Sequence, residues 1–130
     1  MAQTQSVVAI VDDDVSIQRA LARLLSTAGW HAVPFPSAEA FLQTGRHAGP
    51  DCLVLDVWLP GITGVDLLEH LATRGCILPA VIMTARDDLQ MRRRARQAGA
   101  VAYLLKPLDG LELLQTLQAA LDGRHRSGSS

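Results

Sequence analysis

Short apolar runs that alternate with helix-like segments constrain this 130-residue chain more than any other feature. The clearest runs lie at residues 7–11, 52–55, 80–83 and 101–105. They are too short for helices, they are rich in β-branched residues, and they lack the polar alternation of a half-exposed strand. Such runs are typical of strands covered on both faces, as in a parallel sheet. A weaker run at residues 30–35 contains Pro34, which favours either an edge strand or the end of a strand.

Between these runs, apolar residues recur at helical spacing. In the first such segment the pattern extends from Ile17 to Ala28, and Gly29 marks its end. The other predicted helices lie at residues 37–44, after a capping-box pattern at Thr63 and Asp66, between Asp87 or Asp88 and Ala98, and after a capping Asp109. Strands that alternate with helices in this order predict right-handed crossovers and a doubly wound, five-stranded parallel sheet.

The length allows one domain. We expect its body at residues 6–122, a flexible tail at 1–5, and a polar linker or artificial tail at 123–130. Twelve Lys and Arg balance thirteen Asp and Glu, so charge gives no reason to expect direct binding to nucleic acid or to a membrane. No signal peptide or membrane span is evident, and Cys52 and Cys76 follow no disulfide or metal pattern. These features favour the cytoplasm.

Polar side chains follow four of the predicted strands. In chain order they are Asp12, Asp13 and Asp14, then Asp56, then Thr84, then Lys106. Because the carboxyl ends of parallel strands meet at one edge of the sheet, we expect these groups to converge there. Clustered carboxylates with open positions suit Mg²⁺. A carboxylate can also accept a phosphoryl group, whose charge a metal ion and a lysine would neutralise. The pattern therefore predicts a magnesium-dependent phosphoryl-transfer site.

These residues resemble the receiver domain of two-component response regulators over about residues 6–122. The resemblance rests, in order and spacing, on IVDDD at 10–14, LDVWLPGITG at 55–64, IMTAR at 82–86, AGA at 98–100 and YLLKP at 103–107. The amino-acid sequence of these motifs is most similar to that of the FixJ-type receivers, which precede a helix-turn-helix output domain. The resemblance implies a flavodoxin-like (βα)5 fold with strand order 2-1-3-4-5. It also implies a phosphoacceptor switch that catalyses its own phosphorylation and dephosphorylation, rather than a metabolic enzyme.

The resemblance implies a role for each acidic residue. Asp56 would accept the phosphoryl group from a sensor histidine kinase. Mg²⁺ would be held by Asp56, by Asp13 directly, by Asp12 mainly through water, and by the backbone carbonyl of Trp58. These residues would form the metal and phosphoacceptor site.

Further residues would take part in the conformational change that follows phosphorylation. By resemblance, Lys106 would bridge Asp56 and the phosphoryl group, Thr84 would move to bond a phosphoryl oxygen, and Tyr103 would change rotamer with it. The bond between Lys106 and Pro107 would be cis, and Gly64 matches the glycine of the family's loop.

Trp58 departs from the family pattern, which usually has a smaller or more flexible side chain at this position. Its indole would either cover the route of the hydrolysing water, which predicts slow self-dephosphorylation, or only pack on a neighbouring loop.

Four arginines crowd the fourth predicted helix: Arg92, Arg93, Arg94 and Arg96. They form either a solvated basic face or a partner surface. The family uses the fourth helix, fifth strand and fifth helix for dimerisation or output contacts, so a homodimer through this face is one expectation.

Three other functions fit the sequence less well. A phosphohydrolase of the haloacid dehalogenase type needs a second Asp two positions after the nucleophile, where this chain has Trp58. A flavodoxin-like electron carrier needs a phosphate-binding loop after the first strand, where Asp12 and its two neighbours would repel the phosphate. A receiver-like module that is never phosphorylated usually lacks one of the acids, the Thr or the Lys, and all are present here.

Overall fold

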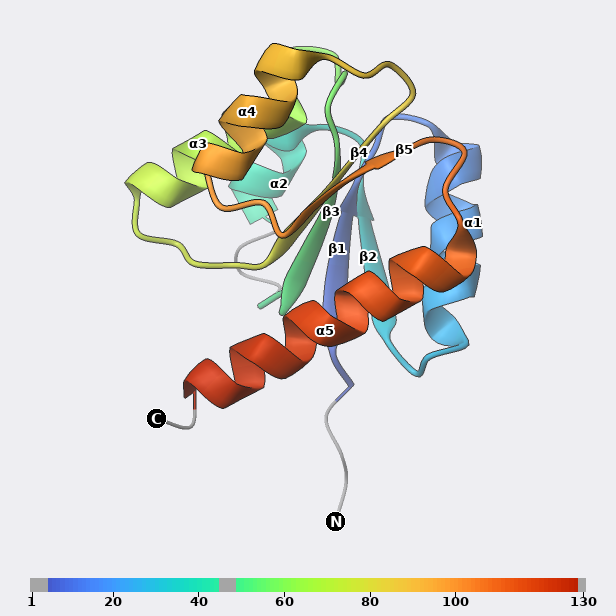
Figure 1. Ribbon diagram of the computed structural model, residues 1–130. Coiled ribbons are helices and arrows are strands. Elements are labelled where there is room, and N and C mark those ends of the chain that lie inside the picture. The colour runs from blue at the N-terminus through green and yellow to red at the C-terminus, as the bar shows by residue number, and fades with distance from the viewer. Residues whose placement is uncertain (1–4, 45–48, 129–130) are drawn as a thin grey trace.

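The computed structural model describes residues 5–44 and 49–128, in which five strands and five helices alternate (Figure 1). The strands are β1 (Val7–Val11), β2 (His31–Phe35), β3 (Cys52–Asp56), β4 (Ala80–Thr84) and β5 (Ala102–Leu105). The helices are α1 (Val15–Ser26), α2 (Ala38–Thr44), α3 (Gly64–Thr73), α4 (Leu89–Gln97) and α5 (Gly110–Gly128). The strands pair in parallel in the order β2-β1-β3-β4-β5, which confirms the predicted fold class.

Helices cover both faces of the sheet. In Figure 1, α1 and α5 lie on one side of the strands, and α2, α3 and α4 lie on the other. Side chains of β3 alternate between the two cores: Leu53 and Leu55 pack with α2 and α3, whereas Cys52 and Val54 pack with α1 and α5. Because every residue of β3 and β4 is buried, these strands read as continuous apolar runs.

Short polar side chains begin the helices as the sequence predicts. Thr63 and Asp66 form the reciprocal capping box of α3, with bonds of 3.0 and 2.9 Å. Asp88, rather than Asp87, caps α4 by accepting a bond from the backbone N–H of Met91. The caps matter for the site because they fix where each strand–helix loop ends.

The last helix is longer than the sequence suggested. We expected a polar tail from residue 123, but α5 continues to Gly128. Its buried Leu113, Leu117 and Leu121 dock the first turns on the sheet, and each later residue then adds one backbone bond at little cost. Gly123 keeps a negative φ and therefore does not end the helix. Most of the expected N-terminal tail, residues 1–4, lies outside the described residues.

A three-residue ion network joins α3 to α4. The Arg94 guanidinium bonds to Asp66 at 2.7 Å and to Glu69 at 2.6 and 3.0 Å. The backbone N–H of Thr63 lowers the pKa of Asp66, and Arg94 lowers it further. One of the four arginines of α4 therefore faces α3, and its charge is matched within the fold.

We expect Asp66→Asn to reduce the free energy of unfolding by about 1 kcal/mol at pH 7, because it weakens a helix cap and a half-exposed ion pair. The pKa of Asp66 in the folded chain lies below its ordinary value of 3.8. Its carboxylate therefore stabilises the fold above that pH, and this contribution disappears as the pH falls through the folded pKa. Chemical denaturation at pH 7 and below pH 3.8 measures the difference from the native chain, with the exposed Asp122→Asn as control. A difference independent of pH would contradict the role of the charge.

Candidate functional site

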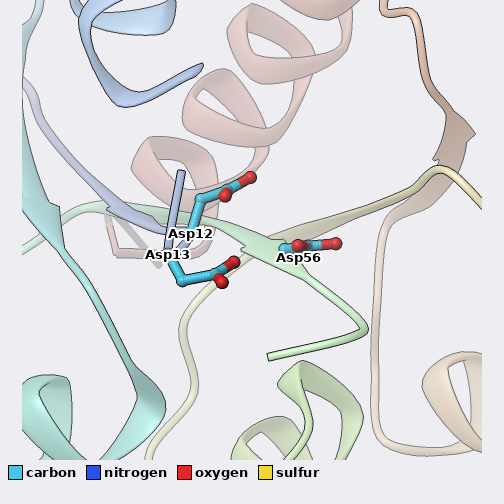
Figure 2. Close-up of side chains that lie close together, drawn as sticks. All are labelled: Asp12, Asp13 and Asp56. Atoms are coloured by element: carbon cyan, nitrogen blue, oxygen red, sulfur yellow. The ribbon is translucent and has the colours of Figure 1, made fainter. Parts of the chain in front are cut away.

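Three carboxylates meet at the carboxyl edge of the sheet. Asp56 is the last residue of β3, and Asp12 and Asp13 follow the neighbouring β1. One carboxylate oxygen from each residue lies within 4.8 Å of the others (Figure 2). Asp12 is fully buried and Asp56 is 7% exposed, whereas Asp13 is exposed. The cluster is thus anchored in the fold on one side and open to water on the other.

Lys106 supplies the positive charge of the site. It follows β5, and its Nζ lies 3.0 Å from Oδ2 of Asp12 and 3.5 Å from Oδ2 of Asp56. Its side chain is only 16% exposed, so the two pairs are poorly screened by water. The structure therefore brings Lys106 to the carboxylates, as the sequence predicts.

The environment of Asp56 disfavours its free carboxylate. Burial raises the pKa of Asp56, and the charge of Asp12 raises it further. Lys106 and a hydrogen bond from the backbone N–H of Trp58 oppose these effects without cancelling them. A cation or a covalent bond at Asp56 would relieve the cost of the buried charge.

The donor set fits Mg²⁺. The cluster offers only oxygen ligands, and the exposure of Asp13 leaves room for the waters that Mg²⁺ retains. The described contact between Trp58 and Asp56 is made by the backbone N–H of Trp58. Metal ligation by its carbonyl stays a prediction.

Asp12 is held by partners on three sides. Its Oδ1 accepts a 2.8 Å bond from the backbone N–H of Asp14, and its Oδ2 faces Lys106. Its backbone carbonyl accepts a 2.6 Å bond from the side-chain amide of Gln18 in α1. The Asp14 side chain caps α1, which explains why it is not part of the carboxylate cluster. Sequence reasoning missed Gln18, because a glutamine on a helix carries no motif that would identify it.

Thr84 ends β4 and is fully buried, but its hydroxyl bonds within its own loop. The Oγ1 donates to the carbonyl of Arg86 at 2.8 Å and accepts from the Arg86 N–H at 3.1 Å. The same carbonyl accepts a 3.2 Å bond from the indole Nε1 of Trp58. The Arg86 guanidinium lies over the indole, 4.2 Å from its centroid. Trp58 is therefore packed on a neighbouring loop; whether it also shields water stays a prediction.

Tyr103 lies on β5 and faces α4. The Arg92 guanidinium stacks 4.7 Å from the ring centroid, and Arg92 also pairs with Asp87 at 3.1 Å. Burial raises the pKa of the Tyr103 phenol, and the backbone N–H of Asp88 at the start of α4 opposes this rise. Arg93 and Arg96 are exposed, so the basic face that α4 presents is smaller than its sequence suggests.

Two structural positions complete the site. The peptide bond between Lys106 and Pro107 is cis, as the resemblance implies. Gly64 begins α3 and donates a 3.0 Å bond to the carbonyl of Val57. A Cβ at Gly64 would overlap the carbonyl oxygen of Asp56. Glycine is needed here because the start of α3 approaches the backbone of Asp56 closely.

A doubly wound sheet with three carboxylates and a lysine at its carboxyl edge defines an α/β domain suited to hold a cation and a phosphoryl group. Residues 8–118 match the response regulator receiver domain family. The chain therefore belongs to that family and is a receiver domain of two-component response regulators.

Relatives and solved structures agree with this assignment. Nodulation protein W of Bradyrhizobium diazoefficiens is 39% identical, over 93% of this chain and 53% of the relative. Transcriptional regulatory protein FixJ of Azorhizobium caulinodans is 35% identical, over 86% of this chain and 53% of the relative. The crystal structure of FixJ-N superposes with a TM-score of 0.82 at 30% identity, over 92% of this chain and 96% of that one. The chain thus spans about half the length of these two relatives.

Among the described residues, none of the helices has the length and apolar character to cross a membrane.

Proposed function

We propose that this chain is phosphorylated on Asp56 by a sensor histidine kinase and changes conformation in response. The observation that carries the proposal is the convergence of Asp12, Asp13 and Asp56, with carboxylate oxygens within 4.8 Å of one another and Lys106 beside them. A structural role alone does not explain three acids packed so closely, because their mutual repulsion destabilises the fold.

In the proposed reaction, a carboxylate oxygen of Asp56 attacks the phosphorus of a phosphohistidine. An O–P bond forms, the P–N bond breaks, and its electron pair remains on the imidazole, which then takes up a proton. Asp13 and Asp56, with Asp12 through water and the carbonyl of Trp58, would hold Mg²⁺, which neutralises charge on the transferring group. Lys106, 3.5 Å from Asp56, would move to a phosphoryl oxygen.

Thr84 and Tyr103 would then change conformation in response to the acyl phosphate. The Thr84 hydroxyl would leave the Arg86 carbonyl and donate to a phosphoryl oxygen, and Tyr103 would change rotamer with it. Attack by water on the phosphorus would break its bond to the Asp56 oxygen, restore the carboxylate and release inorganic phosphate. The chain would thus catalyse both its phosphorylation and its dephosphorylation. Shielding of that water by the Trp58 indole would make the second step slow.

The surfaces beside the site support the proposed partners. An apolar groove of about 540 Å³ borders Lys106 between α1 and the start of α5, and it would receive the kinase. Its lining includes Ile17, Leu21, Leu24, Pro107 and Leu108.

The surface formed by α4, β5 and α5 presents Arg93, Arg96 and the half-exposed Leu105, and it would contact a second copy or an output domain. FixJ is named a transcriptional regulatory protein. The resemblance to FixJ-type receivers implies a longer native chain with a helix-turn-helix output domain that controls transcription, whereas this domain would not bind nucleic acid itself. The proposed compartment is the cytoplasm, because Cys52 and Cys76 follow no disulfide or metal pattern in the sequence.

Incubation with acetyl phosphate tests the proposal directly. We expect the intact mass to rise by one phosphoryl group in the presence of Mg²⁺ and to stay unchanged when a chelator removes the metal. A folded chain that binds Mg²⁺ but gains no mass would contradict the proposal and favour an interaction module that is not phosphorylated.

A further inference from the structure

Trp58 and Arg86 connect the two loops that flank the phosphoacceptor site. Trp58 lies two residues after Asp56, in the loop between β3 and α3, and Arg86 lies two residues after Thr84, in the loop between β4 and α4. The indole Nε1 donates to the Arg86 carbonyl at 3.2 Å, and the Arg86 guanidinium covers the indole ring at 4.2 Å. We call these two interactions the indole latch.

The indole latch acts on the same peptide group that holds Thr84. The Arg86 carbonyl accepts bonds from both the Thr84 hydroxyl and the indole, which together use both of its lone pairs. The Arg86 N–H in turn donates to the Thr84 oxygen at 3.1 Å. Since Trp58 fixes the position of Arg86, it also fixes the partner to which Thr84 is bonded.

A threonine hydroxyl has a single proton to donate. While the Thr84 proton is on the Arg86 carbonyl, it cannot serve a phosphoryl oxygen on Asp56. Movement of Thr84 toward the site therefore requires its separation from Arg86. Any contact that holds Arg86 in place favours the form of the chain that is not phosphorylated.

We propose that the indole latch, through the Arg86 carbonyl, holds Thr84 turned away from Asp56 and thereby lowers the affinity of the site for a phosphoryl group. This inference rests on the proposed function, because it assumes that a phosphoryl group binds at Asp56. Trp58 and Arg86 act here as positioning residues, in addition to any effect of the indole on water. A ligand that draws Thr84 away from Arg86 must spend part of its binding free energy on disrupting the indole latch. A substitution that weakens the latch therefore raises the affinity for that ligand.

Beryllofluoride with Mg²⁺ serves as the probe, because it imitates an acyl phosphate without a chemical step. Trp58→Phe keeps an aromatic ring beside Arg86 but removes the indole N–H. We expect it to raise beryllofluoride affinity about threefold to tenfold, the worth of one net hydrogen bond. Arg86→Ala keeps the carbonyl and removes the guanidinium, with an expected rise of about twofold to fivefold. Titrations followed by ¹⁹F NMR measure both.

Two controls separate positioning from general damage to the fold. In the Thr84→Ala background, Trp58→Phe should leave the affinity unchanged, since the latch then has no hydroxyl to hold. Trp30→Phe, at the buried tryptophan before β2 in the opposite core, should leave the affinity unchanged in the native background. Unaltered affinity in Trp58→Phe, or an equal rise with and without Thr84, overturns the latch. Failure of the native chain itself to bind beryllofluoride with Mg²⁺ overturns the proposed function and the latch with it.

Discussion

Asp56→Asn should abolish phosphorylation by acetyl phosphate and at the same time stabilise the metal-free fold. An amide oxygen is a poor nucleophile, and Asn cannot supply the charge that the site offers to a cation. The expected result is no gain of mass under conditions in which the native chain gains one phosphoryl group. Intact-mass spectrometry measures this loss.

The gain in stability follows from the buried position of Asp56. Burial raises the pKa of this carboxyl above 3.8, so the folded chain binds the proton more tightly than the unfolded chain does. Stability therefore falls as the pH rises from 3.8 through the folded pKa, and the loss is complete above that pKa. Asn at position 56 has no ionisable group, so the variant does not undergo this fall in stability. Lys106 keeps a partner, because Asp12 lies at 3.0 Å.

Chemical denaturation at neutral pH without divalent cations measures the difference, with Asp122→Asn on α5 as control for a change of charge alone. A less stable Asp56→Asn chain would show that the pair with Lys106 outweighs the burial of the carboxylate. A variant that still gained a phosphoryl group would show that another residue is the acceptor.

The fold could be predicted from the sequence because strands that are buried on both faces consist almost entirely of apolar residues, and such runs are easily recognised. The apolar run of β3 marks a strand with no exposed face, and the capping pair Thr63 and Asp66 marks the first turn of α3. The convergence of Asp12 and Asp56 was also predictable. It follows from one rule, that parallel strands bring their carboxyl ends to one edge.

What could not be predicted depends on side-chain rotamers and on contacts between distant segments. The sequence predicts a role for Thr84 at the phosphoryl group, but its bond to the Arg86 carbonyl follows from the turn of one loop. The bond from Trp58 to Arg86 spans 28 residues, and that from Arg94 to Glu69 spans 25. Neither pair has a local pattern that reveals the contact. The length of α5 was missed because a polar sequence ending in Gly and Ser does not reveal how far a docked helix propagates.

Gly64→Ala should destabilise the fold by about 2–3 kcal/mol, the upper part of the usual range for forcing an added carbon into a packed interior. Its Cβ would overlap the carbonyl oxygen of Asp56, and that backbone has little room to yield. The peptide group of the Asp56 carbonyl is held by its Val57 N–H, which donates to the Met83 carbonyl at 3.0 Å. The next peptide is held by the Val57 carbonyl, which accepts from the Gly64 N–H at 3.0 Å. Displacement of Asp56 should also weaken Mg²⁺ binding, because the acid would leave Asp12 and Asp13.

Gly123→Ala provides the matched control for this substitution. Gly123 is also helical, but a Cβ there meets nothing within 4 Å. Alanine at an exposed helix interior should raise the free energy of unfolding by about 0.5–1 kcal/mol. Urea denaturation and a Mg²⁺ titration of both variants should therefore give shifts of opposite sign in stability, with metal affinity changed only at position 64. Equal stability of the two variants would mean that α3 can move away from Asp56, and that the close approach of Gly64 does not hold the phosphoacceptor in place.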